Sequence, residues 1–109
     1  MSTKQFRPWA FPPNAIHVSL DLETASTEPD AAIVQIGAAS RNSSGAAFLF
    51  NSYISLYDCE RQGLHISKET MEWWDKQDPA VRKRVFGGEQ SIKEAIEKSI
   101  AWCTHLAVS

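Results

Sequence analysis

IHVSLDLET, residues Ile16–Thr24, is the stretch on which both the fold and the chemistry of this chain depend. Its apolar and polar residues alternate, which is the two-residue period of a β-strand. The apolar side chains therefore point to one face, while Asp21 and Glu23 share the other, with about 7 Å between their backbones. At that distance two carboxylates can converge on one hard divalent cation, so the strand is a candidate metal site.

The same spacing is also typical of the solvent-exposed face of an ordinary antiparallel strand. Carboxylates this close raise each other's pKa unless a cation neutralises them. The pair is therefore either solvent-exposed or functional, and the spacing leaves both interpretations open.

The composition is that of a single soluble domain, or part of one, with 109 residues, 43% of them hydrophobic and 22% charged. No apolar run approaches the roughly 20 residues of a membrane span, and prolines interrupt the N-terminal segment where a signal peptide would need an apolar core. We therefore expect a cytoplasmic protein with no membrane contact. Cys59 and Cys103 lack metal-site spacing, which favours reduced, buried thiols.

Charge is distributed unevenly along the chain. The net charge is only −2, which argues against binding nucleic acid through a generally basic surface. Residues 16–66 carry six acids and two bases, whereas seven of each follow from Ser67 onward. An enzyme that holds a phosphodiester through bound cations needs acids at its centre, so this balance is compatible with such chemistry.

The first half of the chain predicts three strands. Residues 1–15 contain aromatic residues among three prolines, which favours an extended leader, and residues 16–109 form the folded part. Strands are expected over 16–24, 32–40 and 46–54, with turns over 25–30 and 41–45, the second with Gly45 at positive φ. Short connections between consecutive strands predict an antiparallel meander.

The second half predicts helices. We expect a loop over 56–66, then a helix over 68–77 capped by Ser67, and another that starts at Asp78-Pro79 and ends near Phe86. Ser91 and Glu94 fit a capping box for a last helix. Its apolar stripe, expected to pack on the sheet, is Ile92, Ile96, Ile100 and Cys103. The fold class is thus α/β, a mixed sheet followed by helices.

Two segments together resemble a known family. SLDLET (19–24), a short polar turn and IVQIGA (33–38) resemble the start of the 3′-to-5′ exonucleases of the DEDD superfamily, which have a ribonuclease H-like fold. The later ETMEWWDKQ (69–77) resembles the double-tryptophan helix of the branch found in bacteriophages and some bacteria. The resemblance covers roughly residues 16–86.

The resemblance implies a metal-dependent 3′-to-5′ exonuclease that acts on the 3′ end of single-stranded DNA or RNA. Asp21 and Glu23 match residues that hold two Mg²⁺ or Mn²⁺ ions, of which one activates a water and the other stabilises the departing 3′ oxygen. Thr24 matches a position beside the terminal nucleotide. Trp73 and Trp74 point about 100° apart on a helix, so at most one faces a substrate, and we assign Trp74 to substrate binding.

The chain also departs from the family pattern. Two further aspartates and a His or Tyr general base belong to motifs that follow a helix like the last one here, together with C-terminal strands. We therefore expect a truncated product that is weakly active or inactive, because two carboxylates hold Mg²⁺ weakly. Without a fourth strand, the strand with Asp21 is an open edge that can pair with a second copy, which predicts a homo-oligomer.

Other interpretations remain open at this point. The same fold can serve as a non-catalytic module that binds nucleic acid or a protein partner, and an unrelated α+β domain could carry the acids as surface residues. The basic residues Lys76, Arg82, Lys83 and Arg84 fit either a solvated helix face or phosphate contacts.

Overall fold

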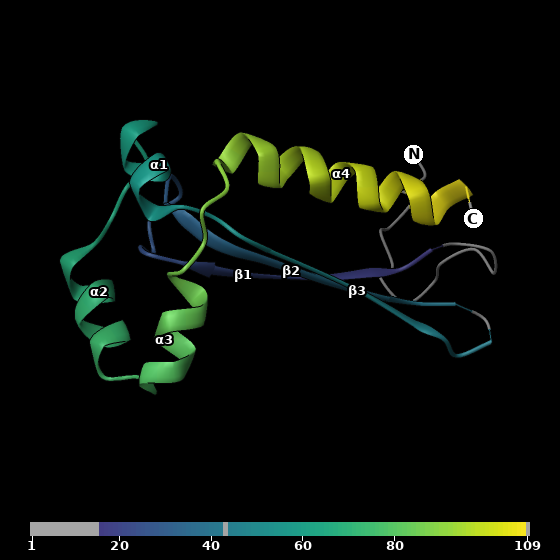
Figure 1. The fold of residues 1–109 in the computed structure, drawn as a ribbon, viewed down its shortest axis with the longest axis horizontal. Helices are drawn as coiled ribbons and strands as arrows, with labels where there is room; N and C mark the ends of the chain where they lie inside the picture. Colours follow the sequence, from purple (N-terminus) through teal and green to yellow (C-terminus); the bar gives the residue numbers. More distant parts are fainter. Residues whose placement is uncertain (1–15, 43, 109) are drawn as a thin grey trace, which may run out of the picture.

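The computed structural model describes residues 16–42 and 44–108 as a three-stranded sheet followed by four helices (Figure 1). The strands are β1 (Val18–Thr24), β2 (Ile33–Arg41) and β3 (Ala47–Tyr53), and the helices are α1 (Leu56–Arg61), α2 (Lys68–Asp75), α3 (Pro79–Val85) and α4 (Ile92–Val108). The sheet is antiparallel in the order β1-β2-β3. The predicted meander and mixed α/β class are confirmed, and the arrangement is compatible with a ribonuclease H-like fold. The predicted leader, residues 1–15, lies outside the described residues.

The register of the sheet decides which side chains share a face. Asp21 pairs with Gly37 and Glu23 with Gln35, while Leu22 pairs with Ile36. Directly paired residues of antiparallel strands point to the same face, so the acids lie on the face of Gln35 and the leucine lies opposite. The register shifts between Glu23 and Thr24, a β-bulge that ends the regular pairing next to the acids.

Helix α4 runs along one face of the sheet (Figure 1) and contacts β2 and β3. The residues that it turns inward are the fully buried Ala95, the half-buried Ile92 and Trp102, and the buried Leu106. The Trp102 ring packs on Phe50, with 5.6 Å between the ring centroids. The predicted stripe is therefore wrong beyond Ile92.

The residues expected in that stripe, Ile96, Ile100 and Cys103, are exposed. A small side chain lets a helix approach a sheet closely, and the fully buried Ala95 packs in the cluster with Ile36 and Ile54 where hydrophobicity alone favoured isoleucine. Of the two thiols predicted to be buried, only Cys59 is.

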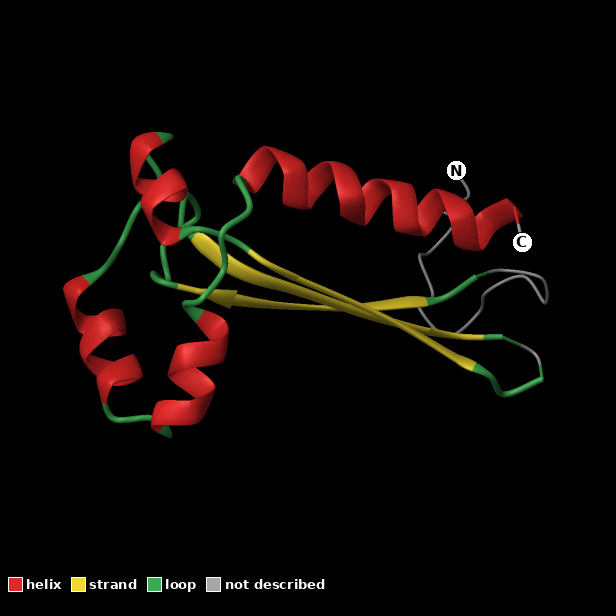
Figure 2. Cartoon of the chain, in the orientation of Figure 1, coloured by secondary structure: helices red, strands yellow, loops and turns green. Residues whose placement is uncertain are grey.

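Helices α1, α2 and α3 gather at the end of the sheet where β1 ends (Figure 2). The caps of α2 and α3 are the predicted ones, because the Ser67 hydroxyl accepts from the Thr70 N–H and Asp78 Oδ1 accepts from the Ala80 N–H. Two buried clusters form here, one around Ile36, Ile54 and Cys59 and one of Val34, Trp74 and Val85.

Helix α1 corrects the loop expected over residues 56–66. Ser55 caps it by accepting from the Asp58 N–H at 3.1 Å, and its inward residue is the fully buried Cys59. The helix has six residues and ends before Gly63, whose φ is +82°. A segment this short shows less than two turns of periodicity, so the sequence pattern could not reveal it.

No helix within residues 16–42 and 44–108 is long and apolar enough to cross a membrane.

Candidate nuclease site

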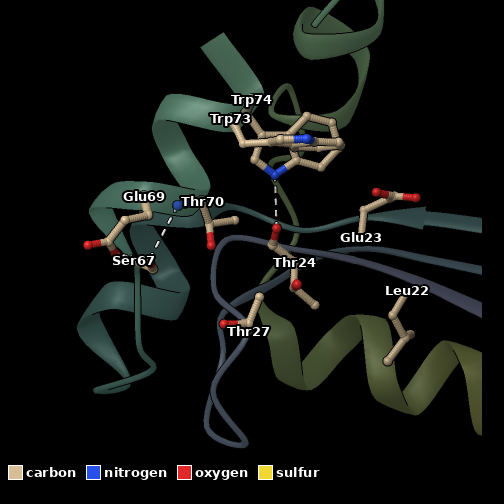
Figure 3. A pocket seen from close by; sticks show the side chains of 9 residues that line it. All are labelled: Leu22, Glu23, Thr24, Thr27, Ser67, Glu69, Thr70, Trp73 and Trp74. Carbon is tan, nitrogen blue, oxygen red and sulfur yellow. Dashed lines mark hydrogen bonds between the residues drawn. The ribbon is translucent and has the colours of Figure 1, made fainter. Parts of the chain in front are cut away.

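Asp21 and Glu23 lie side by side on one face of β1, as the strand period predicts. Asp21 is exposed and Glu23 is half-buried. Burial, and to a smaller extent the neighbouring Asp21 carboxylate, raises the pKa of Glu23. Figure 3 shows Glu23 pointing towards the tryptophans of α2 and Leu22 pointing away from them. A cation at this position would relieve the repulsion between the two carboxylates.

The end of β1 is tied to α2 by a single side chain. The Trp74 indole Nε1–H donates to the Thr24 carbonyl oxygen at 2.9 Å (dashed in Figure 3). Trp74 is only 5% exposed and packs with Val34 and Val85, and its ring meets Phe86 edge-on at 5.3 Å. This contact holds the strand bulge, and with it Glu23, against a buried part of the protein.

The neighbouring Trp73 behaves in the opposite way. It is 54% exposed, and its ring stands at 79° to that of Trp74 with 4.9 Å between centroids. As the 100° step between helix positions requires, one indole packs and the other faces solvent. Trp74, which we assigned to substrate binding, is the buried one. That role stays a prediction, but the exposed ring available for stacking is Trp73.

Two recesses flank these tryptophans, and both are lined by Glu23, Trp73 and Trp74. The larger, of about 470 Å³, is completed by Leu22, Thr24, Thr27, Ser67, Glu69 and Thr70 (Figure 3). The smaller, of about 300 Å³, is completed by Gln35, Gln77, Asp78, Val81, Arg84 and Val85. The first is rich in hydroxyl groups, whereas the second holds an arginine and two amides.

Thr24 lines the larger recess, next to Glu23. Its hydroxyl donates to the Ser26 carbonyl oxygen at 2.8 Å, which fixes the side chain. The hydroxyl oxygen can still accept a hydrogen bond, for example from a sugar. The predicted contact of Thr24 with a terminal nucleotide stays a prediction, and its position in the recess is compatible with it.

The sequence did not single out Gln35, Gln77 or Arg84 as site residues. Arg82 and Arg84 come from one basic run, but Arg82 lies 3.6 Å from Asp75 in an ion pair while Arg84 lines the smaller recess. Only the run as a whole was visible in the sequence, because which basic residue faces the recess depends on how α3 packs. His65 lines neither recess and hydrogen-bonds with Ser26, with 2.6 Å between Nδ1 and the hydroxyl oxygen.

The described residues offer the Asp21–Glu23 pair on β1 and no group of three or more His, Cys, Asp or Glu side chains that could hold a metal ion. Two carboxylates are nevertheless a chemically suitable set for Mg²⁺. This ion keeps several waters and is commonly bound through one or two carboxylates together with substrate phosphates.

A family model, the 3′-5′ exoribonuclease Rv2179c-like domain, matches residues 16–108. The chain belongs to this family. The resemblance to 3′-to-5′ exonucleases seen in the sequence is thereby confirmed, and the match includes β1, α2 and α4 together. No curated protein sequence and no solved structure matches the chain.

Proposed function

We propose that this member of the Rv2179c-like family is a divalent-metal-dependent 3′-to-5′ exonuclease of the DEDD type, with Asp21 and Glu23 as metal ligands. The observation that carries the proposal is the position of the acid pair. The two carboxylates share one strand face, and Glu23 lines two recesses that are also lined by the exposed Trp73.

Bound Mg²⁺ or Mn²⁺ ions would supply an activated water and stabilise the leaving 3′ oxygen. The protein's own residues position these groups. Asp21 and Glu23 offer carboxylate oxygens on one face, and the Trp74–Thr24 hydrogen bond fixes the strand that carries them. Because two carboxylates leave most coordination positions to water and substrate, we expect weak metal binding and slow turnover by the residues present.

The substrate that we propose is the 3′ end of a single-stranded RNA. The family description names an exoribonuclease. The exposed Trp73 ring also fits an unpaired base, which can stack on an aromatic side chain, better than a base in a duplex. Single-stranded DNA is the comparison substrate, since a base offers the same stacking face in either polymer.

The test is a pair of measurements on the wild type and on Asp21→Asn. Titration calorimetry with Mn²⁺ should show heat for the wild type that is lost in the variant. With a 5′-labelled RNA, stepwise shortening from the 3′ end should fall at least 100-fold in the variant, because half of the carboxylate pair is neutralised. Glu28→Asn, which changes an exposed acid in the turn after β1, is the control.

Two results would contradict the proposal. Equal heats of Mn²⁺ binding for the wild type and Asp21→Asn would show that Asp21 is not a metal ligand. RNA that is bound but never shortened would favour a non-catalytic nucleic-acid-binding module instead.

We further propose that the open edge of β1 pairs with a second copy of the chain. Among the described residues β1 is an edge strand of the sheet, and Leu20 on it is 64% exposed. Edge strands with unpaired backbone groups and apolar side chains favour association. Size-exclusion chromatography with light scattering should show a dimer whose fraction rises with concentration. A folded monomer at high concentration would contradict this pairing.

A further inference from the structure

The two recesses beside Trp73 differ in chemistry although they share the same acid. The larger is lined by hydroxyl groups from Thr24, Thr27, Ser67 and Thr70, by Glu69 and by no basic side chain. The smaller is lined by Arg84 and by Asp78. This difference is informative because consecutive nucleotides of a strand make different demands on a 3′-to-5′ exonuclease.

The terminal nucleotide brings a sugar with free hydroxyl groups and a single phosphate, which is the one being cleaved. That phosphate belongs to the acids and their cations, so the terminal nucleotide needs hydroxyl-bonding groups and no further positive charge. The nucleotide before it brings a second phosphate that no cation at the acid pair would neutralise. A basic side chain is the usual partner for such a phosphate.

Arg84 is the basic residue placed for that phosphate. It lines the smaller recess together with Glu23, and among the described residues it forms no ion pair, unlike Arg82. Gln35 and Gln77 line the same recess, and amide side chains can hydrogen-bond the edge of a base. The recess volume, about 300 Å³, lies at the lower end of the range of small-ligand sites.

Trp73 lines both recesses, as do Glu23 and Trp74. Its ring is held edge-on against the buried Trp74, so its exposed surface is presented by a rigid support. A fixed aromatic ring is well suited to stacking, since little conformational entropy is lost when a base covers it.

We propose that the larger recess receives the terminal nucleotide and the smaller one the nucleotide before it, with Trp73 as the stacking surface between them and Arg84 on the phosphate of the second. The inference rests on the proposed nuclease function, in which the acid pair marks the position of the phosphate that is cleaved. It makes the smaller recess a binding subsite for a ribonucleotide within a strand, not for a free mononucleotide.

The test compares two charge-removing substitutions on the same helix, Arg84→Gln and Lys83→Gln, in the full chain carrying Asp21→Asn to prevent hydrolysis. Lys83 is exposed and is not among the residues that line either recess. The probes are 5′-fluorescein decamers of A, C or U, measured by anisotropy, and the corresponding nucleoside 5′-monophosphates as competitors.

Arg84→Gln should weaken decamer binding about fivefold at 0.1 M salt and reduce the slope of log K against log salt by about 0.7, which corresponds to one phosphate contact on a single strand. It should leave monophosphate competition unchanged, since a monophosphate fills only the larger recess. Lys83→Gln should change neither quantity. Trp73→Ala should weaken both ligands roughly 5- to 100-fold, and Trp73→Phe should restore most of the loss.

Three results would overturn the assignment: equal effects of Arg84→Gln and Lys83→Gln on the decamers, an equal loss of monophosphate and decamer binding in Arg84→Gln, or no decamer binding at all. Failure of the nuclease function gives a different result. It would appear as Mn²⁺ binding and RNA shortening that do not depend on Asp21, whereas the decamer-to-monophosphate difference is measured without hydrolysis.

Discussion

The two ends of strand β1 differ in almost every respect that matters to the protein. At Thr24 the strand is bonded to the buried Trp74 and runs directly into the fully buried Ala25. At the other end Val18 and Leu20 are exposed. The acids lie at the boundary between the two. Beyond their pairing with β2, the acids are supported from the Thr24 end by the cluster around Trp74.

Trp74→Ala should produce the largest effect, because it removes a buried indole and leaves the Thr24 carbonyl oxygen without its donor. We expect a loss of about 3–5 kcal/mol in the free energy of unfolding, enough to threaten folding in a chain this small. Trp74→Phe keeps most of the packing and should cost about 1–3 kcal/mol through the lost hydrogen bond. Urea denaturation followed by circular dichroism measures both.

The matched control is Trp73→Ala on the neighbouring, exposed indole. It should cost about 1 kcal/mol, which is the size of an aromatic pair contact. If Trp73→Ala destabilised the protein as much as Trp74→Ala, the contrast between a packed and an exposed tryptophan would be wrong.

This pair of tryptophans also shows which part of the site could be predicted from the sequence. The sequence shows that adjacent helical positions diverge, so one of the two must pack. Which one packs depends on where α2 docks on the end of β1, and that docking involves Val34, Val85 and the Thr24 carbonyl group, which come from three other elements. No local pattern contains this information.

The strands and helices also show which features local sequence patterns can predict. Alternation along β1 and the apolar run of β2 predicted the strands, and side-chain caps predicted the starts of α2 and α3, because these signals are local. The inward stripe of α4 was missed because Ala95 gains its burial from close approach to the sheet, not from strong hydrophobicity of its own. Of the site, the acid pair was visible in the sequence, and the recess with Arg84 was not.

Glu23→Gln should stabilise the metal-free protein, and by less than Trp74→Ala destabilises it. In the folded protein the pKa of Glu23 is raised above its usual 4.5, so folding disfavours its charged form and the carboxylate destabilises the metal-free protein at neutral pH. The variant should melt at most a few degrees higher than the wild type at pH 7 in EDTA. This difference should shrink as the pH falls through the raised pKa and vanish below the usual value, where Glu23 is protonated in both states.

With Mn²⁺ the wild type should melt at a higher temperature than Glu23→Gln. The ion stabilises the wild type through both carboxylates, whereas the amide of the variant is a weaker ligand. Thermal melts between pH 4 and 8, with EDTA or with Mn²⁺, measure both effects, and Glu28→Gln in the exposed turn is the control. A variant that melts lower than the wild type in EDTA at pH 7 would show that the Glu23 carboxylate is already paired with a positive group.

Leu20→Lys should have the smallest effect on the stability of the monomer, although it places a charge on an apolar position of a strand. Leu20 is 64% exposed, so the change in the free energy of unfolding at low protein concentration should stay within about 0.5 kcal/mol.

Ile36→Ala on the adjacent strand β2 removes a buried side chain from the same face and should cost about 2–5 kcal/mol. If Leu20→Lys cost as much as Ile36→Ala in the isolated monomer, then the outer half of β1 would be covered in the folded chain and the two ends of the strand would not differ as described. At high concentration a lysine on the edge strand should also weaken any pairing with a second copy, so the two substitutions separate burial within one chain from contact between chains.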